Sequence, residues 1–208
     1  MKKRDLQIIR DLERFRVMSR DDIVDLYFSH LKQPINSANS VLKRLVRDNQ
    51  IRVSQFFTPY VYIDANSVIK TNSAKIPHFL KIVEAYKQIK KYENPSIFKV
   101  EPKFGDKGTV EPDVYTVIRN VPFFIEIQRS VYSQKTMNDK IKRYEAIYYS
   151  NEFKQFPFII MVTDTRYNIE SDILTVFQVQ SIREFMQNAL KMKGKVHHEP
   201  KEIKFKIG

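Results

Sequence analysis

One stretch of this sequence decides the fold class of its second part: it starts with Glu111-Pro-Asp113 and ends with Phe123-Phe-Ile-Glu126-Ile-Gln128. Two β-rich runs flank the turn Asn120-Val-Pro122, which predicts two consecutive strands. Side chains alternate between the faces of a strand, so Glu126 and Gln128 share one face. If the two strands pair antiparallel, Asp113 joins them, and three oxygen-bearing side chains converge.

This convergence has the chemistry of a divalent-cation site. Mg²⁺ is bound by one or two carboxylates together with water and phosphate oxygens, and a metal-dependent nuclease uses such an ion to activate water beside a phosphate. Asp113 and Glu126 are therefore candidate ligands for Mg²⁺ or Mn²⁺. The alternative is structural: Asp113 begins a strand, and Glu126 pairs with Arg119 or Arg129 as a stabilising contact.

The segments around this stretch predict further helices and strands. Apolar residues at helical spacing indicate a helix that ends before Pro95. The continuous apolar run at 158–162 is typical of a strand buried on both faces. The expected elements are a helix at 77–92, strands at 97–100, 114–119 and 123–128, a helix at 135–149, strands at 158–162 and 174–179, a helix at 181–192 and a basic tail at 193–208.

The composition narrows the class of partner. The 208 residues include 36 Lys and Arg against 24 Asp and Glu, a formal net charge of +12. This surplus favours a nucleic-acid partner over a merely soluble basic protein. The absence of cysteine excludes thiolate metal sites and thiol nucleophiles. No signal peptide and no apolar run of membrane-spanning length is present, so a cytoplasmic protein without membrane contact is expected.

The first part of the chain has the pattern of three helices and a hairpin. Apolar spacing predicts a first helix at 5–17, and Ser19 followed by acids predicts the N-cap of a second. Residues 33–36, which include Pro34, are expected to break the second helix. A third helix is then expected at 37–49. Two β-rich runs then flank Thr58-Pro59. This order resembles a winged helix-turn-helix over residues 5–63.

That resemblance implies a double-stranded DNA partner, because in that family the third helix enters the major groove and the hairpin contacts phosphates. Amide side chains read adenine edges, and Arg reads guanine or phosphate. The candidate DNA-contacting residues are Asn36, Ser37, Asn39, Lys43, Arg44 and Arg47. The alternative is a winged helix that contacts protein and whose basic face is merely solvated.

The second part, from residue 77 to 192, resembles the PD-(D/E)xK nuclease fold, a restriction-endonuclease-like αβββαβ arrangement. Asp113 matches the first acid of that family and Glu126 the second, which implies catalytic roles for both. Gln128 occupies the position of the family's catalytic lysine, where a neutral amide supplies no positive charge. Lys140 and Tyr144 lie four residues apart on the next helix and resemble a Q-x-x-x-Y motif with Lys in place of Gln. Lys140 is therefore the candidate to replace the missing charge.

Together the two parts resemble the replication-relaxation family of plasmids, phages and conjugative elements. The string Glu126-Ile-Gln-Arg-Ser130 carries this resemblance, although only Glu126 and Arg129 match the family's E-x-D-R-G-like string closely. The sequence thus predicts an α+β or α/β chain with a winged helix-turn-helix at 1–70 and a nuclease-like domain with a basic tail at 71–208.

The family resemblance implies a DNA-binding protein that acts in replication, mobilisation or transcriptional regulation of a mobile element. Because Gln128 replaces the lysine, a nuclease-like domain that is inactive and needs no cofactor is favoured. Two alternatives stay open: a Mg²⁺- or Mn²⁺-dependent endonuclease guided by the winged helix, and an adaptor for a replication or conjugation protein. A homo-oligomer stays open as well.

Overall fold

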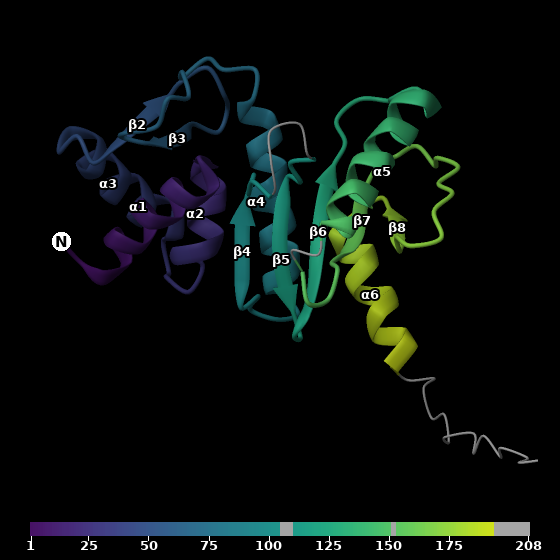
Figure 1. Ribbon diagram of the computed structural model, residues 1–208. Coiled ribbons are helices and arrows are strands. Elements are labelled where there is room, and N and C mark those ends of the chain that lie inside the picture. The colour runs from purple at the N-terminus through teal and green to yellow at the C-terminus, as the bar shows by residue number, and fades with distance from the viewer. Residues whose placement is uncertain (105–109, 151–152, 194–208) are drawn as a thin grey trace, which may run out of the picture.

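The computed structural model describes residues 1–104, 110–150 and 153–193, which form a mixed α+β fold (Figure 1). Apart from its first residue, the basic tail predicted at 193–208 lies outside these described residues. Within the described ranges, no helix combines the length and the apolar character needed to cross a lipid bilayer.

The first part of the chain contains helices and a small antiparallel sheet. In chain order these are α1 (Lys3–Phe15), β1 (Val17–Ser19), α2 (Arg20–Tyr27), α3 (Pro34–Arg47), β2 (Ile51–Ser54) and β3 (Val61–Asp64). The strand order is β1-β3-β2, with β3 antiparallel to both neighbours. Strand β1 was not predicted, because three residues between two helices are too few to show a strand period.

Local sequence explains how α2 and α3 begin. Ser19 caps α2 in a reciprocal pair: its hydroxyl accepts from the Asp22 N–H at 3.1 Å, and the Asp22 carboxylate accepts from the Ser19 N–H at 3.0 Å. The prediction that residues 33–36 form a break between two helices was wrong, because residues 34–36 belong to α3. Pro34 is the first residue of α3, where its missing N–H costs nothing. Helix α3 therefore includes Asn36 and Ser37 in its first turn.

The second part is a five-stranded sheet with helices on both faces (Figure 1). In chain order it contains α4 (Ile76–Lys90), β4 (Ile97–Val100), β5 (Val114–Ile118), β6 (Val121–Ile127), α5 (Gln134–Tyr149), β7 (Phe158–Val162), β8 (Val176–Val179) and α6 (Ile182–Lys193). The order β4-β5-β6-β7-β8 is antiparallel from β4 to β6 and parallel from β6 to β8. Every element predicted from residue 77 onward is present, with ends shifted by a few residues.

The alternation of side chains along β6 assigns them to two hydrophobic cores. Ile125 and Ile127 belong to the core that includes α4 and α6. Phe124 points the other way, and its ring packs 5.5 Å from that of Tyr144 in α5. Glu126 shares the face of Phe124 and therefore faces α5, as the strand period predicted.

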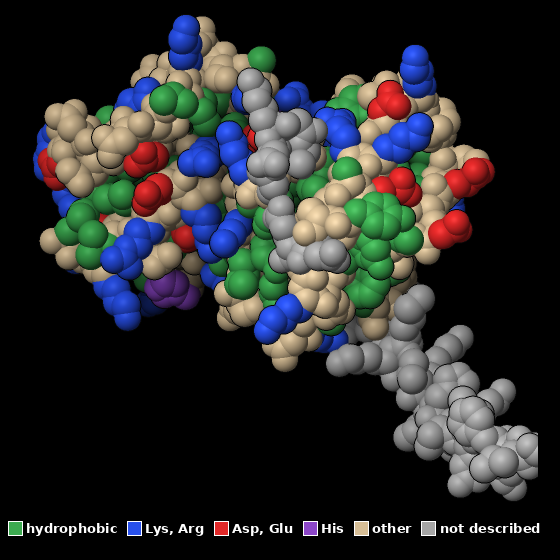
Figure 2. Space-filling model, viewed as in Figure 1, with side chains coloured by type: hydrophobic (Ala, Val, Ile, Leu, Met, Phe, Trp, Pro, Cys, Tyr) green, Lys and Arg blue, Asp and Glu red, His purple; other side chains and the backbone are tan. Residues whose placement is uncertain are grey.

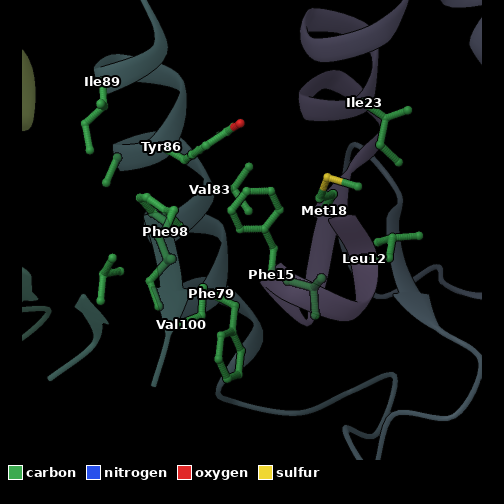
Figure 3. Packing of buried hydrophobic residues seen from close by; sticks show 14 of the residues in the cluster. Leu12, Phe15, Met18, Ile23, Phe79, Val83, Tyr86, Ile89, Phe98 and Val100 are labelled. Atoms are coloured by element: carbon green, nitrogen blue, oxygen red, sulfur yellow. The ribbon is translucent and has the colours of Figure 1, made fainter. Parts of the chain in front are cut away.

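The two sheets share one hydrophobic core. Phe15, at the end of α1, is fully buried, and its ring lies 4.9 Å from that of Tyr86 in α4 and 5.8 Å from that of Phe98 in β4 (Figure 3). The guanidinium of Arg14 lies 4.3 Å above the Phe15 ring and 4.6 Å above the Tyr86 ring. Such cation–π contacts add to the burial of apolar area. Helix α4 thus packs against both parts of the chain.

Ion pairs also join α4 to the first part of the chain. The ammonium group of Lys87 in α4 lies 2.9 Å from the carboxylate of Asp22 and 2.7 Å from that of Asp25, both in α2. Burial alone would lower the pKa of Lys87, but its hydrogen bonds to Asp25 and Asp22 raise the pKa above the ordinary value. The lysine is therefore held charged, and the first part is fixed to the second by polar as well as apolar contacts.

Candidate functional site

Helix α3 turns its polar residues away from the core. Ala38, Leu42 and Leu45 are buried at positions that recur on one helix face. The remaining surface carries the partly exposed Ser37 and the exposed residues Asn36, Asn39, Lys43 and Arg47. These five predicted DNA contacts therefore lie on an accessible helix surface.

The two exposed cations of α3 have weak competing contacts. Within the described part of the chain, Lys43 forms no ion pair. Among the residues that the structure describes, Arg47 pairs only with its neighbour Asp48, at 3.0 Å, and both side chains are exposed. Exposed pairs of this kind contribute little free energy in water. Both cations are thus available to an anionic partner.

Arg44 differs from the other predicted DNA contacts. Its guanidinium lies 2.5 Å from the carboxylate of Asp5 in α1, which is fully buried. Burial alone would raise the pKa of Asp5, but hydrogen bonds from Arg44 and Arg4 lower it. Arg44 therefore joins α3 to α1 and offsets a buried charge, while its side chain stays 37% exposed. Its assignment as a DNA contact stays a prediction.

A groove of about 530 Å³ lies between α3 and the β2–β3 hairpin. The exposed lining is mainly apolar, with two cations and two amides among the residues that form it: Arg20, Asn39, Lys43, Val46, Val53, Gln55, Thr58, Pro59, Tyr60 and Tyr62. Cations and amides are the groups that contact phosphates and base edges in protein–DNA complexes. Two of the predicted contacts, Asn39 and Lys43, line this groove.

The two predicted acids are neighbours in the five-stranded sheet. Val114 pairs with Ile125, so Asp113, one residue before Val114, lies opposite Glu126. The Asp113 carboxylate accepts a hydrogen bond from the Ile127 N–H at 2.6 Å. The structure thus brings Asp113 and Glu126 together at the end of β6, through the antiparallel pairing that the sequence analysis assumed.

Glu126 is only 2% exposed, and both of its oxygens are engaged. Lys140 of α5 forms an ion pair with one oxygen, and the hydroxyl of Tyr144 donates to the other. Burial raises the pKa of Glu126 to about 7, against the lowering effect of the Lys140 charge and with a further raising effect of Asp113. Lys140 therefore lies where the helix after β6 was expected to place it.

The alternative partners suggested for Glu126 have other contacts. Arg119 lies in the turn between β5 and β6, and its guanidinium is 2.8 Å from the Glu93 carboxylate. Arg129 donates to the main-chain carbonyl of Ala74 at 3.3 Å. Both arginines are exposed or partly exposed, whereas Glu126 faces the interior under α5.

Asp113 has a partner that sequence reasoning missed. Nε2 of His78, in the first turn of α4, lies 3.0 Å from the Asp113 carboxylate. This hydrogen bond raises the pKa of His78, although burial lowers it. The sequence held little signal for the contact, because His78 shows no motif and lies 35 residues before its partner.

Gln128 occupies the position of the expected lysine and is incompletely bonded. Its main-chain N–H donates to the Val162 carbonyl at 2.9 Å, which continues the ladder with β7. Its side-chain amide is buried, and neither polar atom has a hydrogen-bond partner among the described residues. Buried amides are normally satisfied, so we expect a water molecule or a ligand group beside Gln128.

Asp113 and Glu126, called the acid pair below, fit a divalent cation poorly. No group of three or more His, Cys, Asp or Glu within the described ranges is placed to hold a metal ion. All four carboxylate oxygens of Asp113 and Glu126 already have protein partners. A cation would have to displace His78 or Lys140 from these oxygens. The arrangement is that of two acids offset by the chain's own basic side chains.

In comparisons with known proteins, the chain matches no protein-family model, no curated protein and no solved structure. The resemblances to a winged helix-turn-helix, to a PD-(D/E)xK nuclease and to the replication-relaxation family therefore stay predictions.

Substitution of Lys140 tests how Glu126 is stabilised. In the natural chain, the raised pKa means that stability contributed by this carboxyl falls as the pH rises from about 4.5 to about 7. Lys140→Met removes the charge that offsets the buried carboxylate, so the pKa of Glu126 should rise further. We expect little loss of stability at pH 5 and a loss of about 3 kcal/mol at pH 8, measured by urea unfolding.

Two further variants control for this result. Lys142→Met changes an exposed lysine on the same helix and should leave stability nearly unchanged at both pH values. When Lys140→Met is made in a Glu126→Gln background, the stability that it costs should be the same at pH 5 and at pH 8. An equal loss at both pH values in Lys140→Met would show that the lysine acts through packing alone.

Proposed function

We propose that this chain is a double-stranded DNA-binding protein in which residues 1–70 act as a winged helix-turn-helix. The observation that carries this proposal is the exposed polar surface of α3 beside the β2–β3 hairpin. In this arrangement α3 lies in the major groove and the hairpin contacts the phosphate backbone. The net charge of +12 supports the same partner, because phosphate contacts supply much of the affinity for DNA.

We further propose that residues 71–208 are a nuclease-like domain that binds DNA without cleaving it. The helix–three-strand–helix–strand order, with β4 to β6 antiparallel and β7 parallel to β6, supports this fold. Gln128 in place of the lysine, together with two acids that are already offset by Lys140 and His78, supports the loss of cleavage. The resemblance to the replication-relaxation family supports a role in replication, mobilisation or transcriptional regulation of a mobile element.

Substitutions on α3 test the DNA-binding proposal. Lys43→Ala and Arg47→Ala should each weaken binding to duplex DNA and lower the slope of log K against log salt by about 0.9, because each removes one phosphate contact. Asn39→Ala should instead reduce the preference for a selected duplex over a random one. Fluorescence anisotropy over a range of salt concentrations measures both effects.

Matched controls use exposed cations on other helices. Lys90→Ala, at the end of α4 far from the hairpin, and Arg183→Ala on α6 remove the same charges away from α3. If these two variants weaken binding as much as the α3 variants do, DNA attraction is a matter of net charge and α3 is not the contact surface.

A metal-dependent endonuclease is a second candidate, favoured by one observation: a lysine reaches an acid that lies beside a second acid. Lys140, Glu126 and Asp113 meet at the end of β6. Because the acids fit a cation poorly, we expect no nicking of supercoiled DNA with Mg²⁺ or Mn²⁺. Nicking by the natural chain that is lost in Glu126→Gln but kept in Glu111→Gln, an exposed neighbour, would establish the endonuclease instead.

A further inference from the structure

The segment between β3 and α4, together with the first half of α4, is unusual in its charge. Residues 65–83 contain Lys70, Lys75 and Lys81 but no Asp or Glu. All three lysines are exposed, and no carboxylate in the described ranges lies within ion-pair distance of them. These three side chains are called the lysine bridge below. None of them has an ion-pair partner among the described residues, although Lys81 lines the same surface hollow as Asp21, Asp22 and Glu84, so Lys70 and Lys75 are the two that lie apart from acids.

The start of this segment is fixed to the β2–β3 hairpin. The guanidinium of Arg52, in β2, donates to the main-chain carbonyls of Ser67 at 2.5 Å and Ile69 at 3.1 Å. The hydroxyl of Ser54, at the end of the same strand, donates to the Thr71 carbonyl. The main chain on both sides of Lys70 therefore has a set position relative to the hairpin.

The end of the segment is fixed to the acid pair. Arg129, just after β6, donates to the Ala74 carbonyl at 3.3 Å, and His78 is bonded to Asp113 at 3.0 Å. Lys75 lies between these two anchors. Figure 2 shows Lys and Arg side chains along the upper side of the molecule, from the hairpin region toward α5. The lysine bridge thus leads from the hairpin to the end of β6.

We propose that the lysine bridge contacts the phosphate backbone of the duplex bound by α3, so that one continuous DNA molecule lies along α3, the hairpin and the end of β6. This inference rests on the proposed DNA-binding function. A duplex carries one negative charge per about 1.7 Å of its axis, so spaced, unpaired lysines on a fixed surface match it.

The acid pair does not oppose this path. The charge of Lys140 offsets that of the buried Glu126. The hydrogen bond from His78 to Asp113 raises the pKa of His78, which favours a positive charge beside that acid. A single strand is a poorer match, because its recognition relies on aromatic platforms for stacking. The most exposed apolar side chain of the segment is Val68, at 97%, which offers no ring.

A pair of double variants tests the lysine bridge. Lys70→Ala with Lys75→Ala should lower the slope of log K against log salt by about 2, at about 0.9 per phosphate contact. It should leave base preference unchanged. In hydroxyl-radical footprinting, protection should be lost on one flank of the α3 site only.

The matched control is Lys90→Ala with Lys91→Ala. These exposed lysines lie at the opposite end of α4, a helix of 15 residues, or about 22 Å. The inference is overturned if this control lowers the slope equally, or if the Lys70–Lys75 variant keeps both its slope and its flank protection. If the natural chain does not bind duplex DNA at all, the proposed function fails together with the inference. If only the assignment of α3 as the contact surface fails, protection of the flank in the natural chain still tests the lysine bridge by itself.

Discussion

The burial of Phe15 between Tyr86 and Phe98 is the contact on which the rest of the structure depends. It inserts the end of α1 into the core of the five-stranded sheet, and the cation above its ring and the Lys87 ion pairs reinforce it. Full burial of one such side chain contributes about 1.5–3 kcal/mol. Because α4 packs against both parts of the chain in the core that they share, α3 and the acid pair hold fixed positions relative to each other. The exposed face of α3 and the end of β6 become parts of one body, although residues 65–75 have the polar composition of a loose connection.

The acid pair shows how the same residues can serve different chemistry. Two carboxylates placed opposite each other on paired strands are a common route to a metal site, but here each oxygen has a partner from the chain itself. The charge of Lys140 lies on α5 rather than two residues after Glu126 on β6, and the buried amide of Gln128 takes the strand position. The consequence is a surface whose negative charge is offset before any ligand arrives. That property suits contact with a phosphate backbone better than it suits cleavage of one.

Local patterns in the sequence were sufficient to predict every element except β1, as well as one key pairing. The two-residue period of β6 and the turn before it placed Glu126 beside Asp113, because register and alternation are short-range properties. Contacts between residues far apart in the chain were not predictable in this way. Arg44 has the helix position of a DNA contact, yet it reaches Asp5, 39 residues away, and His78 reaches Asp113 with no motif to mark it. Pro34 was misread because a proline both ends and begins helices, and only the three-dimensional context of its N–H position separates the two.

The claim that one duplex lies along α3 and the lysine bridge can be tested most directly by site-directed DNA cleavage. The chain has no cysteine, so Asn72→Cys places a single thiol on the exposed surface between Lys70 and Lys75 for attachment of an iron chelate. We expect cuts in both strands at a fixed position on one flank of the α3 site, and none from a chelate attached through Lys91→Cys at the far end of α4. A bound conjugate at residue 72 that leaves the duplex uncut, or cuts of equal strength from residue 91, would contradict it.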